Sequence, residues 1–115
     1  CDRYADSTRA FQVHAQGVSG EVYGALASMA LEGLKPDLTL ILDLPPEIGM
    51  ARAAGRGVVA DRFERLGLDF HGRVRTGFLT IAAAEPDRCA VIDATAAPEA
   101  VFASVLATTE ARLSP

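Results

Sequence analysis

Residues 38–44 read Leu-Thr-Leu-Ile-Leu-Asp-Leu, a continuous apolar run with the length of a strand. A continuous run, as opposed to an alternating one, predicts a strand that is covered on both faces at the centre of a parallel sheet. Pro45 and Pro46 follow at once, and proline is tolerated in the first turn of a helix. We therefore expect a helix over residues 47–54. The run Cys-Ala-Val-Ile-Asp at residues 89–93 predicts a second short buried strand.

Helical patterns fill most of the remaining chain. Residues 6–8 offer side-chain oxygens that can cap a helix, which we expect over residues 7–16. Ser19 opens a second helix that is apolar nearly all round, so we expect it to be buried. A long helix is predicted over residues 68–84, and a last one begins at Pro98.

The predicted order is helix, helix, strand, helix, helix, strand, helix. Strands that are connected through helices imply right-handed crossovers and a parallel sheet with helices on both faces. Two strands are too few for such a sheet, so we expect its other strands to lie before Cys1. The 115 residues, 50% of them hydrophobic, then make one α/β domain or part of one.

Composition argues against several classes of protein. The formal charge of −4 is unfavourable for binding nucleic acid, which rewards a basic surface. The sequence has no cleavable leader, and no apolar run approaches the roughly 20 residues that span a bilayer, so a cytoplasmic setting is expected. Cys1 and Cys89 are too few for a disulfide framework or a zinc site, and we expect buried reduced thiols.

Arginines are concentrated in the middle of the chain. Between positions 52 and 75 they number six: Arg52, Arg56, Arg62, Arg65, Arg73 and Arg75. The first three surround a glycine-rich segment between two helices. Phosphoryl transfer needs the charge on the phosphoryl oxygens neutralised and water excluded, which a mobile arginine-bearing lid supplies. The alternative is a solvated loop with arginines at helix ends.

Asp2 and Arg3 stand just before the first helix, and Cys1 fits the last residue of a strand. This arrangement puts both side chains at the carboxyl end of a strand, where open α/β sheets bind ligands. Arg3 offers a planar fork suited to phosphate, and Asp2 can orient it or hold a metal-bound water. The alternative is an exposed ion pair.

Thr8, Phe11 and Gln12 occupy positions i, i+3 and i+4 and project from one face of the first helix. A hydroxyl, an aromatic ring and an amide suit a planar base, because the ring stacks on it and the amide pairs with its edge. The alternative is that Phe11 belongs to the core while Thr8 and Gln12 are solvated.

Four motifs in order resemble those of bacterial thymidylate kinases. They are DRYxxSTxxFQ at residues 2–12, PDLTLxLDxPPE at 36–47, DRFE at 61–64 and LDFHxRV at 68–74, followed by the strand end VIDA at 91–94. The resemblance runs from end to end. It implies an α/β fold of the P-loop kinase type with its N-terminal strands missing, residues 1–115 being a partial domain with a lid at about residues 55–65.

Carried over by position, the resemblance implies that Arg3 bridges the phosphates of the two nucleotides, with Asp2 beside it. The residues implied at the deoxynucleotide and its thymine are Ser7, Thr8, Phe11 and Gln12. Family members often have tyrosine at the position of Phe11. The hydrogen bond of that hydroxyl is therefore lost here, and only stacking remains.

The resemblance also implies a lid over the ATP phosphates. Arg56 is our choice for the arginine that assists transfer, and Arg52 is second. The residues implied on the ATP side are Arg52, Arg56, Asp61, Arg62 and Glu64. The turn after Asp93 would lie near the adenine. Mg²⁺ would arrive with ATP, and no metal ligand is assigned in the chain.

The implied reaction is ATP-dependent phosphorylation of dTMP to dTDP by a homodimer. The family holds ATP with a glycine-rich loop ending in Gly-Lys-Ser or Gly-Lys-Thr, and this pattern does not occur in the chain. We therefore expect the loop upstream of Cys1 and no activity from the 115 residues alone. Two alternatives stay open: a deoxynucleoside kinase or another nucleoside monophosphate kinase, and a non-catalytic nucleotide-binding or dimerising module.

Overall fold

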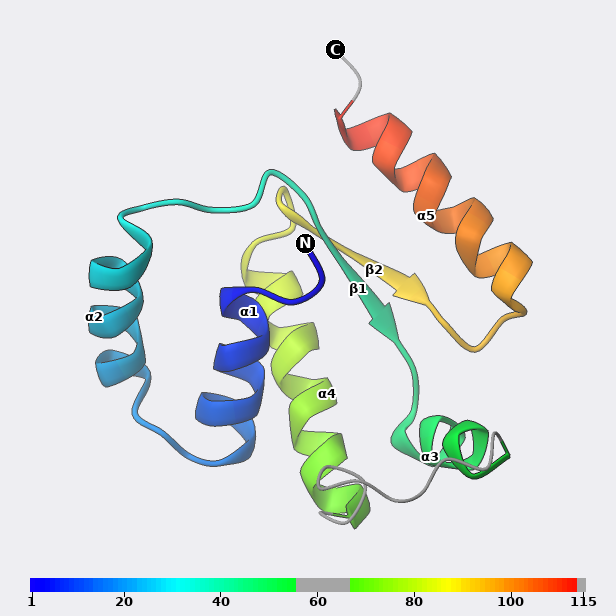
Figure 1. Ribbon diagram of the computed structural model, residues 1–115, viewed down its shortest axis with the longest axis horizontal. Coiled ribbons are helices and arrows are strands. Elements are labelled where there is room, and N and C mark those ends of the chain that lie inside the picture. Colours follow the sequence, from blue (N-terminus) through cyan, green and yellow to red (C-terminus); the bar gives the residue numbers. More distant parts are fainter. Residues whose placement is uncertain (56–66, 114–115) are drawn as a thin grey trace.

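The computed structural model describes residues 1–55 and 67–113. Its elements in chain order are α1 (Ala5–Thr8), η1 (Arg9–Ala15), α2 (Gly20–Leu31), β1 (Thr39–Asp43), α3 (Pro46–Gly55), α4 (Gly67–Ala84), β2 (Cys89–Asp93) and α5 (Pro98–Leu113). The predicted order of helices and strands is confirmed, with α1 and η1 forming the first helix (Figure 1). No described helix combines the length and the apolar character that crossing a membrane requires.

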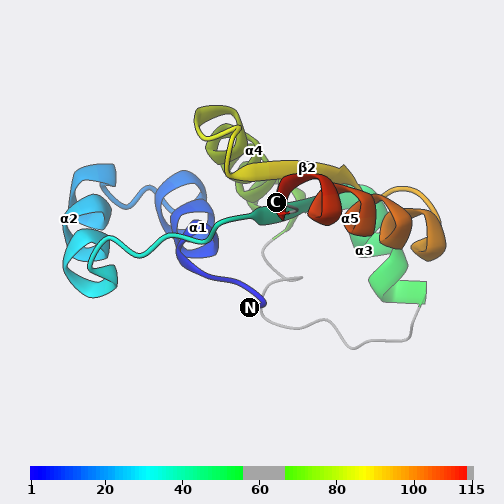
Figure 2. The same ribbon diagram turned by 90° about the horizontal axis from the view of Figure 1, so that it is seen from above.

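The two strands pair in parallel, in a register that runs from Thr39 opposite Cys89 to Asp43 opposite Asp93. Helix α4 lies on one side of the strands and α5 on the other (Figure 2). Side chains alternate between the two faces of a strand, and Ile41 and Ile92 are buried whereas Leu42 and Val91 stay largely exposed. The prediction of a parallel α/β fold with helices on both faces is confirmed.

Helix α4 is the centre of the core. Phe70, Val74 and Ile81 are spaced along one face of it and are buried. The same face crosses η1 closely at Gly77, where a Cβ atom would lie 2.8 Å from the Cβ of His14. Glycine is therefore required at this crossing, because carbon atoms in ordinary contact are about 3.5–4.0 Å apart.

The first helix begins two residues earlier than predicted and is not capped by residues 6–8. Its N-cap is Tyr4, which makes no side-chain capping hydrogen bond. The predicted capping groups have other partners, because the Asp6 carboxylate accepts from Arg88 at 2.8 Å and the Ser7 hydroxyl accepts from Arg3 at 3.3 Å. After Thr8 the backbone continues as a π-helix through η1, a form that is frequent at functional sites.

The prediction that the second helix is buried is wrong. Its start is as predicted, since the Ser19 hydroxyl caps Val22 N at 3.4 Å, but α2 contains no buried residue. Leu26 is 61% exposed and Met29 is 78% exposed. The physical reason is position: α1 and η1 lie between α2 and α4 (Figure 1), so one side of α2 faces the rest of the fold and nothing described covers the other.

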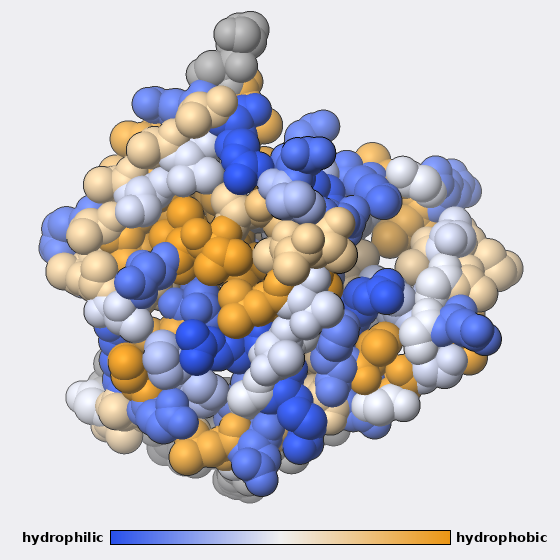
Figure 3. Space-filling model, turned by 180° about the vertical axis from the view of Figure 1, so that it is seen from behind, coloured by the Kyte–Doolittle hydropathy of each residue, from blue (hydrophilic) through white to orange (hydrophobic). Residues whose placement is uncertain are grey.

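Two smaller expectations about burial are also wrong. Ile41 and Ile92 are buried in the strands, but Leu42 is 55% exposed, so β1 is not covered along both faces by the described residues. Figure 3 shows apolar side chains open to solvent on the face seen from behind. Cys89 is buried as expected, and burial raises the pKa of its thiol, whereas Cys1 is exposed.

Candidate functional site

Arg3, Ser7 and Phe11 form one group at the start of the chain. Arg3 Nη1 donates to Ser7 Oγ at 3.3 Å, and its guanidinium lies 5.5 Å from the centroid of the Phe11 ring. The backbone of Arg3 has a φ of +71°, which is uncommon for a residue with a side chain. Such a conformation costs about 1 kcal/mol or more and clusters at functional sites.

The guanidinium of Arg3 is open to an anion. The side chain is exposed, and the bond to Ser7 is its one hydrogen bond among the described residues. The carboxylate of Asp2 is also exposed and makes no ion pair within residues 1–55 and 67–113. The alternative of an Asp2–Arg3 ion pair is therefore not what the structure contains.

Phe11 is half-buried against α4. Its ring centroid lies 6.0 Å from that of Phe70 and 6.4 Å from that of Phe78, the latter edge-on. Thr8 and Gln12 are exposed on the same helix. The structure thus packs Phe11 between Arg3 and the core and leaves Thr8 and Gln12 exposed to solvent. This arrangement also agrees with the alternative in which Phe11 is a core residue and the other two are solvated. Their role toward a base stays a prediction.

A paired carboxylate ends β1. Arg75 of α4 donates from Nε to Asp43 Oδ1 at 2.8 Å and from Nη2 to Asp43 Oδ2 at 3.0 Å. This hydrogen bonding raises the pKa of Arg75. The sequence analysis missed the pair, although an aspartate at the end of an apolar strand is a signal, because a carboxylate entering a buried environment needs a partner.

Arg52 joins the last turn of α3 to the turn after β2. Its guanidinium donates to the carbonyl oxygens of Ala94 at 2.7 Å and Thr95 at 3.0 Å. The same turn is closed by Asp93, whose Oδ1 accepts from the hydroxyl of Thr95 at 2.6 Å and from its amide at 2.9 Å. These bonds lower the pKa of Asp93. Arg52 therefore shapes the turn that the resemblance places near the adenine.

A pocket of about 360 Å³ lies between the carboxyl end of β1, α3 and α4. Asp43, His71 and Arg75 line it, together with Phe78. Phe78 links this pocket to the Arg3 group, because its ring also lies edge-on to that of Phe11. The structure thus brings together residues from α1, η1, α4 and β1.

Four predicted lid residues, Arg56, Asp61, Arg62 and Glu64, lie outside the described residues. The described members of the arginine cluster are all bonded, since Arg73 Nε donates to Ala15 O at 3.0 Å in addition to the bonds of Arg52 and Arg75. Within the described part of the chain, no group of three or more His, Cys, Asp or Glu residues is placed to hold a metal ion.

A parallel α/β fold with basic and acidic side chains at the carboxyl ends of its strands defines a ligand-binding α/β domain. The sequence model of the family described as thymidylate kinase matches residues 1–105, and the chain belongs to the thymidylate kinase family.

Curated relatives and a solved structure agree with this assignment. The chain is 53% identical over 105 residues to a thymidylate kinase of Caulobacter vibrioides, covering 91% of this chain and 50% of the relative. It is 52% identical over 103 residues to one of Rhodopseudomonas palustris strain TIE-1, covering 88% and 45%. The crystal structure of a thymidylate kinase from Ehrlichia chaffeensis matches with a TM-score of 0.67 and 27% identity, covering 94% of this chain and 49% of that one. The chain spans about half the length of these relatives.

Proposed function

We propose that this chain supplies the acceptor side of an enzyme that transfers the γ-phosphoryl group of ATP to dTMP and yields dTDP. The observation that carries the proposal is the Arg3 group, in which an exposed guanidinium in a strained backbone conformation is held by Ser7 and Phe11. Membership of the thymidylate kinase family supports it.

Arg3 would neutralise charge on the phosphates of both nucleotides. Phosphoryl transfer depends on positioning and on electrostatic stabilisation of the phosphoryl oxygens, so no covalent intermediate and no general base are assigned. The bond to Ser7 and the contact with Phe11 hold the guanidinium, and its remaining donors would bind the phosphates. Thr8 and Gln12, both exposed, would face the deoxynucleotide and its base.

Mg²⁺ would accompany ATP. This ion prefers oxygen ligands and keeps several of its waters when it binds nucleotide phosphates. Asp43 is paired with Arg75 and Asp93 accepts from Thr95, whereas Asp2 makes no ion pair among the described residues. Asp2 therefore fits the part of accepting a hydrogen bond from a metal-bound water.

The ATP side of the proposal concerns the segment after α3. Arg56 would reach the transferred group, and Asp61, Arg62 and Glu64 would lie at the base of the lid. Arg52 would act through the turn that it holds by the carbonyls of Ala94 and Thr95.

The domain is proposed to be partial in function as well as in length. A Gly-Lys-Ser or Gly-Lys-Thr loop does not occur in the 115 residues, so we expect no turnover from this chain alone. The active protein would be a cytoplasmic homodimer, by analogy with the family.

The experiment is a coupled ADP-release assay on the protein extended upstream of Cys1 to include a phosphate-binding loop, with dTMP as acceptor. We expect Arg3→Ala to lower kcat by about a hundredfold, as removal of one transition-state donor does in other enzymes. Arg112→Gln is the matched control and should keep full activity. Arg112 lies in the last turn of α5 and donates to the carbonyl oxygens of Pro86 and Asp87.

The same assay separates the alternatives. A preference for thymidine or dCMP over dTMP would assign a deoxynucleoside kinase or another nucleoside monophosphate kinase. Failure to turn over any acceptor with the loop present would assign a non-catalytic nucleotide-binding or dimerising module. Equal activity of the Arg3→Ala variant and the parent would remove Arg3 from the mechanism.

A further inference from the structure

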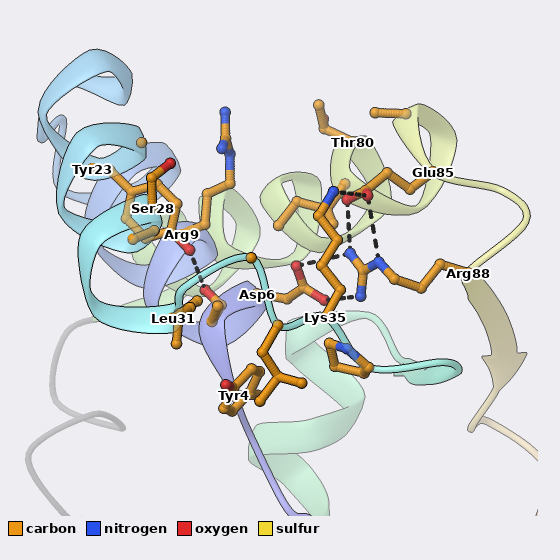
Figure 4. Close-up of a pocket in the computed structure, with 18 of the residues that line it drawn as sticks. Tyr4, Asp6, Arg9, Tyr23, Ser28, Leu31, Lys35, Thr80, Glu85 and Arg88 are labelled. Atoms are coloured by element: carbon orange, nitrogen blue, oxygen red, sulfur yellow. Dashed lines mark hydrogen bonds and ion pairs between the residues drawn. The ribbon is translucent and has the colours of Figure 1, made fainter.

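A second pocket lies away from the carboxyl ends of the strands. It has a volume of about 470 Å³ and is enclosed by α1, η1, α2 and the end of α4 (Figure 4). One wall reaches the amino ends of both strands, because Arg88, which precedes β2, donates to the hydroxyl of Thr39 at 2.8 Å. This pocket therefore lies at the amino ends of the strands, whereas Asp43 and Asp93 lie at the carboxyl ends.

The acidic side chains of the pocket are neutralised within its own wall. Arg88 binds both oxygens of Asp6, at 2.8 and 3.1 Å, and also Glu85 at 2.7 Å. Lys35 adds a bond to Glu85 at 3.3 Å. These bonds raise the pKa of Arg88 and lower that of Glu85. A cationic ligand would find no free carboxylate here among the described residues.

Arg9 is different from the other charged side chains of the pocket. Its guanidinium lies 5.3 Å from the centroid of the Tyr23 ring and has no carboxylate partner in the described part of the chain. Figure 4 shows its side chain extending away from the network of Asp6, Glu85 and Arg88, with no dashed line on its guanidinium. Counting Asp, Glu, Lys and Arg, the lining carries three cationic and two acidic side chains, so one positive charge is in excess.

The remaining lining is largely apolar and comes from α2, the segment after it and α4. Its apolar members include Ala27, Leu31, Leu34, Ile81 and Ala84. An apolar surface beside one unpaired cation fits a ligand with an apolar body and a single negative charge. From this complementarity we infer that the pocket binds a small amphiphilic monoanion, such as an aromatic carboxylate, with its carboxylate on Arg9. The inference does not rest on kinase activity.

The test is a titration of the ¹⁵N-labelled 115-residue chain with naphthoate, followed by amide chemical shifts. We expect the shifts to gather at Ala27, Leu31 and Ala84. Naphthamide, which has the same rings and no charge, should bind about tenfold more weakly or worse, because a hydrogen bond to a charged group is lost. Arg9→Gln should weaken naphthoate by a similar factor and leave naphthamide unchanged.

Two further variants keep the inference open to refutation. Arg9→Lys retains the charge and should retain most of the binding, and Arg112→Gln, outside the pocket, should bind as the parent does. Shifts gathered at Asp43 and Arg75, equal affinity in Arg9→Gln and the parent, or no binding of naphthoate would each overturn it. Turnover of dTMP is not measured in this experiment, so the proposed kinase function can fail without affecting the result.

Discussion

Replacing Gly77 with alanine tests the helix crossing that sets Phe11 against α4. The added Cβ would lie 2.8 Å from His14 Cβ, 2.9 Å from His14 Cγ and 3.2 Å from Ala10 Cα. Ordinary carbon contacts are about 3.5–4.0 Å, so η1 and α4 have to move apart by roughly half an ångström or more. Overpacking of this kind costs about 1–3 kcal/mol, and the better helix propensity of alanine returns about 1 kcal/mol. We expect a net loss of up to about 2 kcal/mol relative to the parent.

Gly72→Ala is the matched control in the same helix. A Cβ at Gly72 meets no described atom within 4 Å, so only the helix propensity changes. We expect this variant to be more stable than the parent by about 0.5–1 kcal/mol. The two substitutions are chemically identical, so the difference between their free energies of unfolding isolates the cost of the crossing.

The assay is urea unfolding followed by far-ultraviolet circular dichroism on the parent and both variants. A free energy of unfolding for Gly77→Ala equal to or above that of Gly72→Ala would refute the reasoning, since it would mean that η1 and α4 are not in close contact. In the loop-containing protein, the same variant should raise KM for dTMP, because Phe11 and Arg3 move with η1.

Two other predictions concern titration and reactivity. Hydrogen bonding from Arg88 lowers the pKa of Glu85 from its usual 4.5. The ionised carboxylate therefore stabilises the fold above pH 4.5, and this stabilisation is lost as the pH falls through the lower pKa of the folded state. The free energy of unfolding of Glu85→Gln should fall less steeply with acid than that of the parent, and equal slopes would contradict this. Iodoacetamide should alkylate the exposed Cys1 of the native chain and spare Cys89, which is 3% exposed, until urea unfolds the chain. Mass spectrometry of native and unfolded samples measures the labelling of each thiol. Rapid labelling of Cys89 in the native chain would contradict its burial.

Local patterns in the sequence were sufficient for the strands and for α4. The run at residues 89–93 and helix α4 both carry their own hydrophobic signal, and α4 begins within one residue of its predicted start. Burial of α2 could not be obtained in the same way. An apolar helix pattern states that a surface is available for packing, while the identity of what covers it depends on elements far away in the chain.

The failed cap at the first helix has a similar origin. Asp6 has the right side chain for a cap, yet it bonds to Arg88, which lies 82 positions later. The Arg3 group was within reach of sequence reasoning, because Arg3 and Ser7 are four residues apart and belong to one motif. The pair of Asp43 and Arg75 joins residues 32 positions apart, and no local pattern reports such a partner.

Net charge describes the surface as a whole, whereas binding depends on which cations lack partners. Most described arginines are committed to acceptors within the fold: Arg52, Arg73 and Arg112 to carbonyl oxygens, and Arg75 and Arg88 to carboxylates. Within residues 1–55 and 67–113, Arg3 and Arg9 are the arginines with neither kind of acceptor. Both flank α1, one beside Phe11 and the other beside Tyr23, so a single short helix presents an open guanidinium to each of the two proposed sites. An acidic chain can therefore still offer two cations to anionic ligands, because Arg3 and Arg9 are not bonded to a carboxylate or a carbonyl oxygen within the described residues.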